Sequence, residues 1–207
     1  LDPAAGTLTF PAESIKEAIK ESKKFSDSTS SLKEHFLSHF FAFEYQMAAY
    51  IIGHLRMSLL FEEMGMPLED RFPLYLTNSL ESGSIQTDMF TGFGFGKAIT
   101  EESNQANKVK SELPIMVVMG NPPYSVSSSN TIKQDSDFKK LYESYKENVR
   151  KEERNIQPLS DDYIKFLAFA HWKVKQAGKG IVGMITNNSY LDCLIHRDMR
   201  KKLLDDF

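Results

Sequence analysis

Two short apolar runs, each followed by a polar turn, constrain the fold more than any other feature. Ile115–Met119 and Ile181–Ile185 read as β-strands, and helical patterns lie between them over about 137–154 and from Asp161 to Gln176. A strand buried on both faces is a continuous apolar run, and parallel strands are joined by right-handed helical crossovers. The sequence therefore predicts an α/β fold with a doubly wound, mostly parallel sheet in which both runs are interior strands.

The first half of the chain shows the same alternation. Its patterns predict helices over 11–24 and 45–64 and strands over Leu37–Phe43 and Phe72–Leu76, and a final helix is expected from about Leu191. Residues 25–33 are Ser-rich and 81–113 show no convincing period, so both are expected to be loops, the second a loop insertion. The whole chain, residues 1–207, is expected to be one partial domain that is truncated at both ends.

Composition excludes several classes of protein. The chain is 41% hydrophobic and 26% charged and has no apolar run of eighteen residues, which argues against disorder and against a membrane protein. A single cysteine, Cys193, excludes a disulfide framework, and the five histidines share no metal-ligand spacing. Residues 1–130 hold 10 Lys and Arg against 16 Asp and Glu, whereas 131–207 hold 15 against 12. The weakly basic second part permits a polyanion nearby without requiring one.

Polar clusters follow three predicted strands, the first of which is represented by Leu1-Asp2-Pro3, read as the tip of a strand. The clusters are Asp2–Thr9, Thr77–Leu80 and Asn121–Tyr124. Because ligands of doubly wound sheets bind at the carboxyl ends of strands, we expect the functional residues in these clusters.

The tetrapeptide Asn121-Pro122-Pro123-Tyr124 is the most specific of the three clusters. Its prolines remove two backbone donors and fix φ, which favours a rigid turn with outward-pointing carbonyl groups. The Asn121 side-chain oxygen and the Pro122 carbonyl can accept both hydrogens of an exocyclic amine, and Tyr124 offers a flat face for a stacked ring. From the residues alone, the turn is either such a site or a structural turn at a sheet edge.

This tetrapeptide resembles that of the amino-methyltransferases, which move a methyl group from S-adenosylmethionine to an exocyclic or amide nitrogen. Three later segments, 160–166, 180–191 and 197–200, look like the methylase portion of single-polypeptide restriction–modification enzymes. The motif order, with a cofactor loop before the Asn-Pro-Pro-Tyr loop, is that of γ-class adenine-N6 DNA methyltransferases. The resemblance covers essentially all 207 residues. It implies a Rossmann-like S-adenosylmethionine-dependent methyltransferase fold, no metal, and catalytic residues Asn121, Pro122, Pro123 and Tyr124.

The same resemblance implies a cofactor site. The segment from Asp2 to Thr7 is similar to the loop that wraps the methionine part of S-adenosylmethionine, although Leu8 stands where the family usually has a second glycine. Glu44 is expected to accept hydrogen bonds from the ribose hydroxyls, and Asn78 to read the adenine. Taken alone, Glu44 is explained as well by a helix N-terminus, and Asn78 by a turn. The full set of expected cofactor-binding residues is Asp2, Pro3, Ala4, Gly6, Thr7, Glu44, Asn78, Leu80, Tyr163 and Phe166.

The resemblance also implies the reaction and its partners. We expect methylation of adenine N6 in double-stranded DNA through direct attack by a flipped-out base, in a bacterial, cytoplasmic restriction–modification system. Nuclease and motor segments are expected on the same parent polypeptide, no target-recognition domain is recognised in the sequence, and no membrane partner is expected. Arg197 and Arg200 fit a solvated helix face better than phosphate contacts. Two other functions stay open: a protein glutamine N5-methyltransferase, and a non-catalytic methyltransferase-fold module that binds DNA.

Overall fold

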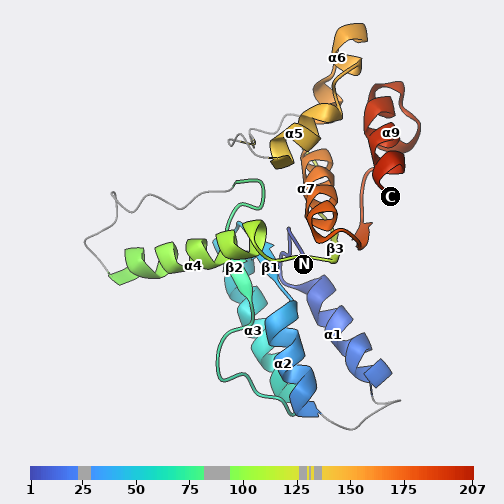
Figure 1. Ribbon diagram of the computed structural model, residues 1–207. Helices are drawn as coiled ribbons and strands as arrows, with labels where there is room; N and C mark the ends of the chain where they lie inside the picture. The colour runs from blue at the N-terminus through green and yellow to red at the C-terminus, as the bar shows by residue number, and fades with distance from the viewer. Residues whose placement is uncertain (23–28, 82–93, 126–129, 131, 133–136) are drawn as a thin grey trace. The chain divides into compact units, whose positions relative to one another are not determined.

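The chain forms two compact units of mixed helices and short parallel strands. The computed structural model (Figure 1) describes residues 1–22, 29–81, 94–125, 130, 132 and 137–207. Unit 1 comprises residues 1–78 and 83–112, and unit 2 comprises residues 79–82 and 113–207. Each unit holds one parallel strand pair, β1 (Ala42–Glu44) with β2 (Leu74–Leu76) and β3 (Val117–Gly120) with β4 (Ile181–Met184). The mixed α/β fold with parallel pairing is confirmed, whereas a single doubly wound sheet stays a prediction.

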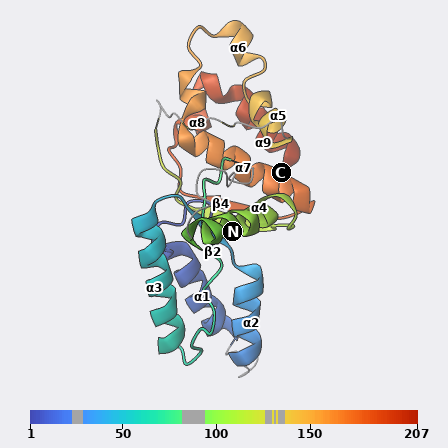
Figure 2. The same ribbon diagram turned by 90° about the vertical axis from the view of Figure 1, so that its left-hand side faces the viewer.

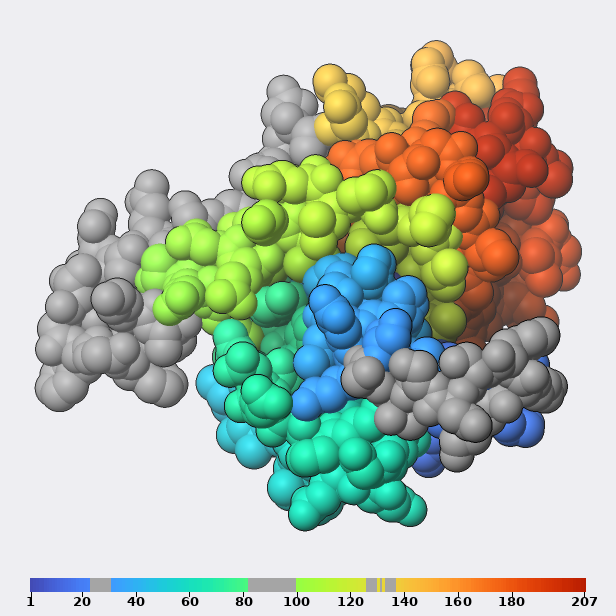
Figure 3. Space-filling view, turned by 60° about the horizontal axis from the view of Figure 1, so that its bottom comes forward, coloured from blue at the N-terminus to red at the C-terminus, as the bar shows by residue number. Residues whose placement is uncertain are grey.

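In the described residues of unit 1, four helices lie around the strand pair. They are α1 (Thr9–Ser22), α2 (Thr29–His39), α3 (Met47–Glu63) and α4 (Gly94–Ser111). Phe61 of α3 lies between the rings of Phe36 and Phe72, with centroids 6.3 Å away on each side, and all three rings are buried. At the surface of this unit, α2 and the segment after α3 lie side by side in Figure 3. Helices α1 and α3 confirm the helical periods expected at 11–24 and 45–64.

The second helix is a correction to the sequence prediction. Residues 29–39 form α2, whereas the sequence predicted a loop to residue 33 and a strand over Leu37–Phe43. Of that predicted strand only Ala42 and Phe43 belong to β1. Phe36 and Phe40 are four residues apart and their rings meet edge to face with centroids 5.2 Å apart. An apolar run this short fits a helical face as well as a strand, and here packing of the aromatic pair decides for the helix.

The structure also corrects part of the prediction for residues 81–113. Residues 94–111 form α4, whereas no regular structure was expected there. Residues 82–93 lie outside the described residues, and the presence of an insertion therefore stays a prediction. The buried face of α4 includes three polar side chains, Glu102, Ser103 and Lys110. Because polar residues occupy much of the inward face, the helix has little of the apolar period that sequence reading depends on.

Unit 2 is built around one long, largely buried helix, α7 (Asp162–Ala177), which packs on β3 and β4. The other helical segments are α5 (Asp137–Ser144), α6 (Val149–Glu152), α8 (Ser189–Asp192), α9 (Arg197–Asp206) and the 3-10 turns Gln157–Ser160 and Leu194–His196. Figure 2 shows α5 and α9 beside α7. The single helix expected over 137–154 is interrupted, because the Asp198 carboxylate accepts the N–H groups of Asn148 and Val149 at 2.7 and 3.0 Å and starts a new helix there.

Within unit 2 the strand pair is covered on one face, and the expected place of both strands in the interior of a larger sheet stays a prediction. Val118 is fully buried, but Val117, Ile181 and Ile185 are exposed. The two strands approach closely at Gly180, where a Cβ atom would lie 2.1 Å from the Met116 carbonyl oxygen. A glycine is therefore required for the hydrogen bond from the Ile181 N–H to that oxygen at 2.7 Å.

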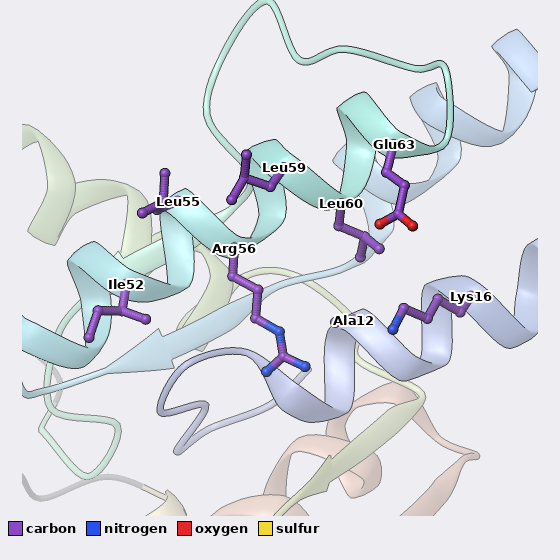
Figure 4. Close-up of a pocket in the computed structure, with 8 residues that line it drawn as sticks. All are labelled: Ala12, Lys16, Ile52, Leu55, Arg56, Leu59, Leu60 and Glu63. Carbon is purple, nitrogen blue, oxygen red and sulfur yellow. The ribbon is translucent and has the colours of Figure 1, made fainter.

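Helix α3 also leaves apolar side chains at the surface. Ile52, Leu55 and Leu59 are more than half exposed, and they line a groove of about 440 Å³ between α1 and α3 (Figure 4). Among the described residues, none of the helices has the length and apolar character needed to cross a membrane.

Candidate functional site

The first polar cluster begins as an extended strand tip beside β1. Asp2 pairs in parallel with Ala42, its carbonyl accepts the Phe43 N–H at 2.9 Å, and the Ala5 N–H donates to the Phe43 carbonyl at 2.9 Å. The strand character expected for the first residues is therefore confirmed. The chain then turns at residues 3–8, which we call the first loop, and enters α1.

The first loop takes the left-handed backbone conformation at two positions. Gly6 has φ = 53° and Leu8 has φ = 64°. An L-residue pays roughly 1–2 kcal/mol for this conformation, which explains why a glycine is usual at position 8 in the family that the sequence resembles. Here the Leu8 side chain is fully buried and lies against Gly53 of α3, where a Cβ would come within 3.3 Å of it. Burial of the leucine offsets the backbone strain, so the substitution keeps the turn that glycine would make.

Two charged side chains hold the first loop in place. One Glu44 carboxylate oxygen accepts the Gly6 N–H at 2.7 Å, and the other accepts the N–H groups of Tyr45 and Gln46 at 2.8 and 2.6 Å. From α3, the Arg56 guanidinium donates to the Thr7 carbonyl at 3.3 Å and to the Thr9 hydroxyl at 2.9 Å, and Figure 4 shows it reaching toward this loop. A carboxylate has about four acceptor positions, so Glu44 keeps about one for a ligand.

Asp2 is a buried acid with an unused acceptor. Its side chain is 1% exposed; Oδ1 accepts the Ala4 N–H at 3.1 Å, and Oδ2 is buried without a hydrogen-bond partner among the residues that the structure describes. Burial raises the pKa of Asp2 to about 7, and the Ala4 N–H opposes part of that rise. An unpartnered buried carboxylate oxygen beside a glycine-containing loop fits a cationic ligand group.

The second polar cluster follows β2 in the same unit. The Thr77 N–H donates to the Glu44 carbonyl at 2.8 Å, which joins the ends of β1 and β2. From α4, the buried Lys110 ammonium donates to the Thr77 hydroxyl and to the Asn78 carbonyl, both at 2.7 Å, and lies 5.3 Å from the centre of the Phe43 ring. Within unit 1 the structure therefore brings Gly6, Glu44 and Thr77 to one sheet edge. Leu80 is buried and belongs to unit 2.

The third polar cluster, Asn121–Tyr124, follows β3 directly in unit 2. The Tyr124 hydroxyl lies 3.0 Å from Asn121 Oδ1 and 2.9 Å from the Ile185 carbonyl oxygen, which follows β4. One hydroxyl hydrogen thus serves two acceptors, so both oxygens point at the same small volume. The Tyr124 ring is 47% exposed, and Pro122 is buried whereas Asn121 and Pro123 are exposed.

Aromatic side chains extend this site along α7. The rings of Tyr124 and Tyr163 have centroids 5.8 Å apart, and the Tyr163 hydroxyl lies 3.1 Å from the Ser189 hydroxyl at the start of α8. Burial raises the pKa of Tyr163. Tyr163 is therefore a neighbour of the Asn-Pro-Pro-Tyr turn, and Phe166 is buried in α7. Both were expected near a cofactor pocket, and that role stays a prediction.

The two arginines of the last helix have protein partners. Arg197 pairs with Glu152 at 2.7 Å and with Glu153 at 2.9 Å. Arg200 donates to the carbonyl groups of Tyr190 and Cys193, both at 2.8 Å. These contacts give both guanidinium groups a structural use within unit 2.

Sequence reasoning missed three groups that shape the candidate sites. They are the ammonium of Lys110, the carbonyl of Ile185 and the carboxylate of Asp161, which accepts the Ser125 N–H at 2.8 Å directly after the turn. A backbone carbonyl carries no sequence signal. The acid at 161 precedes a helical period and could be recognised as an N-cap, but its second contact depends on tertiary structure.

The comparison with protein families decides the class of this chain. The family model described as the Eco57I restriction-modification methylase matches residues 46–207. The chain belongs to this family. The Asn-Pro-Pro-Tyr turn, β4 and α7 all fall within the matched part of this methylase domain, and the first loop precedes it.

Solved structures similar to the methylase domain include two Type ISP restriction–modification enzymes and a DrdV–DNA complex. A nuclease-deletion mutant of the Type ISP enzyme LlaGI, in complex with a DNA substrate mimic, matches 100% of this chain at 23% identity with a TM-score of 0.77. The ATP-dependent Type ISP enzyme LlaBIII, bound to DNA, matches 98% at 25% identity and a TM-score of 0.76. A DrdV–DNA complex matches 100% at 24% identity and a TM-score of 0.72.

The methylase domain is short beside these enzymes. It spans 17%, 13% and 19% of the LlaGI, LlaBIII and DrdV chains, respectively. No curated protein matches it.

Proposed function

We propose that this methylase domain transfers a methyl group from S-adenosylmethionine to the N6 nitrogen of adenine in DNA. The observation that carries the proposal is the Asn-Pro-Pro-Tyr turn directly after β3, where Asn121 Oδ1 and the Ile185 carbonyl both lie within 3.0 Å of one hydroxyl donor. Asn121 Oδ1 is thereby held in the same turn as the Pro122 carbonyl, and two acceptors in one turn suit an amine, which brings two N–H groups. Membership in the restriction-modification methylase family supports the reaction class.

The residues of unit 1 fit the cofactor. S-adenosylmethionine supplies an activated methyl group when it is bound. The unpartnered Asp2 Oδ2 suits the ammonium of its methionine part, and the remaining acceptor of Glu44 suits one ribose hydroxyl. The backbone of Pro3, Ala4, Gly6 and Thr7 forms the turn around these groups, and the N-terminus of α1 that follows favours a carboxylate. Asn78 is proposed to read the adenine, with its backbone held by Lys110.

The residues of unit 2 fit the acceptor amine. The exocyclic amine of adenine is conjugated with its ring, which makes its lone pair a weak nucleophile. Asn121 Oδ1 and the Pro122 carbonyl are proposed to accept its two hydrogens, which aligns the lone pair for direct attack on the methyl carbon. As the new C–N bond forms, the bond between the methyl carbon and the sulfonium sulfur would break and the sulfur would keep its electron pair. One of the amine hydrogens then leaves as a proton, and the exposure of Asn121 gives that proton a path to water.

An amine inside a duplex cannot reach this turn. The base must therefore leave the stack, and the half-exposed Tyr124 ring offers a face on which it can be held. We propose double-stranded DNA as the substrate. Nuclease and motor segments on the same polypeptide are also proposed, since the solved enzymes that the chain resembles are several times longer.

The test compares the polypeptide that carries these residues with its Asn121→Ala variant. Each is incubated with DNA and methyl-labelled S-adenosylmethionine, and the DNA is digested to nucleosides. Label is expected on N6-methyladenine, and the variant is expected to be slower by about 100- to 1,000-fold, the usual loss on removal of one positioned polar group. Label on a protein glutamine would refute the DNA substrate, and an unimpaired variant would refute the role of Asn121.

A further inference from the structure

One carboxylate oxygen accepts backbone N–H groups at both tyrosines of the candidate acceptor site, that of Tyr163 itself and that of the residue after Tyr124. Asp161 Oδ1 accepts the N–H of Ser125, the residue after Tyr124, at 2.8 Å, and the N–H of Tyr163 at 3.4 Å. The side chain is 6% exposed. The rings of these two tyrosines are the neighbours described above, with centroids 5.8 Å apart.

Helix capping alone does not explain this contact. Asp161 is the N-cap of α7, with φ = −60° and ψ = 144°, and a cap needs only the hydrogen bond from the first turn of the helix. The shorter of its two contacts goes outside the helix, to Ser125, 36 residues earlier in the chain. A buried carboxylate is costly unless it is hydrogen-bonded, so the Ser125 N–H is a substantial part of what keeps this acid in place.

The next residue of α7 strengthens the same attachment. Asp162 and Lys165 are both buried and lie 3.3 Å apart. Lys165 Nζ donates to the Asn130 carbonyl at 2.5 Å, and the Asn130 side chain donates to Asp162 at 3.4 Å. The first turn of α7 is thus bonded to the chain after the Asn-Pro-Pro-Tyr turn at two points, Ser125 and Asn130.

We propose that Asp161 is a positioning residue for the methyl-acceptor site: by accepting the N–H groups of Ser125 and Tyr163 on one oxygen, it fixes the Tyr124 ring against the Tyr163 ring. The inference rests on the proposed function for its consequence in catalysis. A stacked base needs a ring held at a set place, and a shift of about 1 Å in a positioning group costs about 100-fold in rate. Asp161 itself acts through Tyr124 and does not touch the substrate.

The discriminating variant is Asp161→Ser. Serine is as good an N-cap as aspartate, so α7 keeps its cap, but the shorter side chain cannot also reach the Ser125 N–H. Asp161→Asn keeps the length and the Oδ1 acceptor. The matched control is Asp198→Ser, since Asp198 also accepts two backbone N–H groups, those of Asn148 and Val149, far along the chain from the turn.

Two readouts separate the inference from the proposed function. The first is amide hydrogen exchange, which needs no activity: Asp161→Ser is expected to speed exchange in a peptide covering Asn121–Ser125 by about 10-fold or more, while Asp198→Ser speeds it only at 148–149. The second is methylation. Asp161→Ser is expected to lower kcat by about 10- to 100-fold with an unchanged Kd for S-adenosylmethionine, Asp161→Asn is expected to recover most of the rate, and Asp198→Ser is expected to have no effect.

Each result has one meaning. Unchanged exchange at Asn121–Ser125 in Asp161→Ser overturns the inference, whether or not the protein methylates DNA. If the unmodified protein methylates DNA and Asp161→Ser does so at the same rate, the inference fails and the proposed function stands. If the unmodified protein labels no nucleoside while exchange responds as expected, the proposed function fails and the attachment of the turn by Asp161 stands.

Discussion

Cofactor affinity is predicted to depend on pH through Asp2. Burial raises the pKa of this acid to about 7, and its Oδ2 has no partner in the described residues. If the ammonium of S-adenosylmethionine pairs with Oδ2, only the ionised form binds it well. A group with a pKa of about 7 is about 90% ionised at pH 8 and about 10% ionised at pH 6, so affinity is expected to fall about 10-fold over these two pH units.

The same shift predicts how stability depends on pH. The folded protein keeps the Asp2 proton up to about pH 7, whereas the unfolded chain loses it near the ordinary value of 3.8. Stability from this group is therefore complete below about pH 4 and is lost as the pH rises to about 7, by at most about 4 kcal/mol. Asp2→Asn is expected to remove this slope.

The assay is a titration of S-adenosylmethionine at pH 6, 7 and 8, followed by calorimetry. The unmodified protein is expected to show the 10-fold change, and Asp2→Asn is expected to bind weakly at every pH. Asp70→Asn is the matched control, because it makes the same change at an exposed acid of unit 1. A Kd that does not change between pH 6 and 8 in the unmodified protein would refute the pairing of Asp2 with the ammonium.

Substitutions at three positions test other parts of the structure. Tyr124→Phe keeps the ring and is expected to stay within about 10-fold of the parent methylation rate, whereas Tyr124→Ala loses a stacking face worth about 1–3 kcal/mol. Both are measured by methylation and by 2-aminopurine fluorescence. An equal loss of rate in both variants would assign the role to the hydroxyl. Gly53→Ala places a Cβ 2.9 Å from Leu74 and 3.3 Å from Leu8, so urea denaturation is expected to show a free energy of unfolding lower by about 1–3 kcal/mol. An unchanged midpoint would contradict this packing. Gly180→Ala meets the Met116 backbone at 2.1 Å and is expected to cost more than Gly53→Ala in the same assay; a smaller cost would show that β3 and β4 can separate there without loss.

The elements with a clear apolar period were predictable from the sequence. Helices α1, α3 and α7 and the strand at 181–184 lie where their patterns indicated. The polar turn at Asn121–Tyr124 was also found, because two prolines after an apolar run restrict the backbone by themselves.

The parts that could not be predicted depend on tertiary contacts. The inward face of α4 carries the buried side chains of Glu102 and Lys110, which bond to the backbone at the end of β2. Because these side chains are charged, the sequence of α4 does not show an apolar face. The break between α5 and α6 depends on Asp198, about 50 residues later. The second contact of Asp161 likewise depends on a residue far away in sequence. Local pattern carries no information about such partners.

The turn at Leu8 has a consequence for how relatives of this chain are recognised. Position 8 is a leucine where the family usually has a glycine. Position 53, in the middle of α3, is a glycine where a helix usually carries a side chain. The space beside Gly53 is filled by Leu8 of the first loop together with Leu74 of β2. Substitution at the two positions is therefore expected to be correlated: relatives with a bulky residue at position 8 should have glycine at 53, and those with glycine at 8 can carry a side chain at 53 where position 74 also leaves room. A search pattern that insists on the glycine alone would pass over the first group, whereas the pair of positions would identify both.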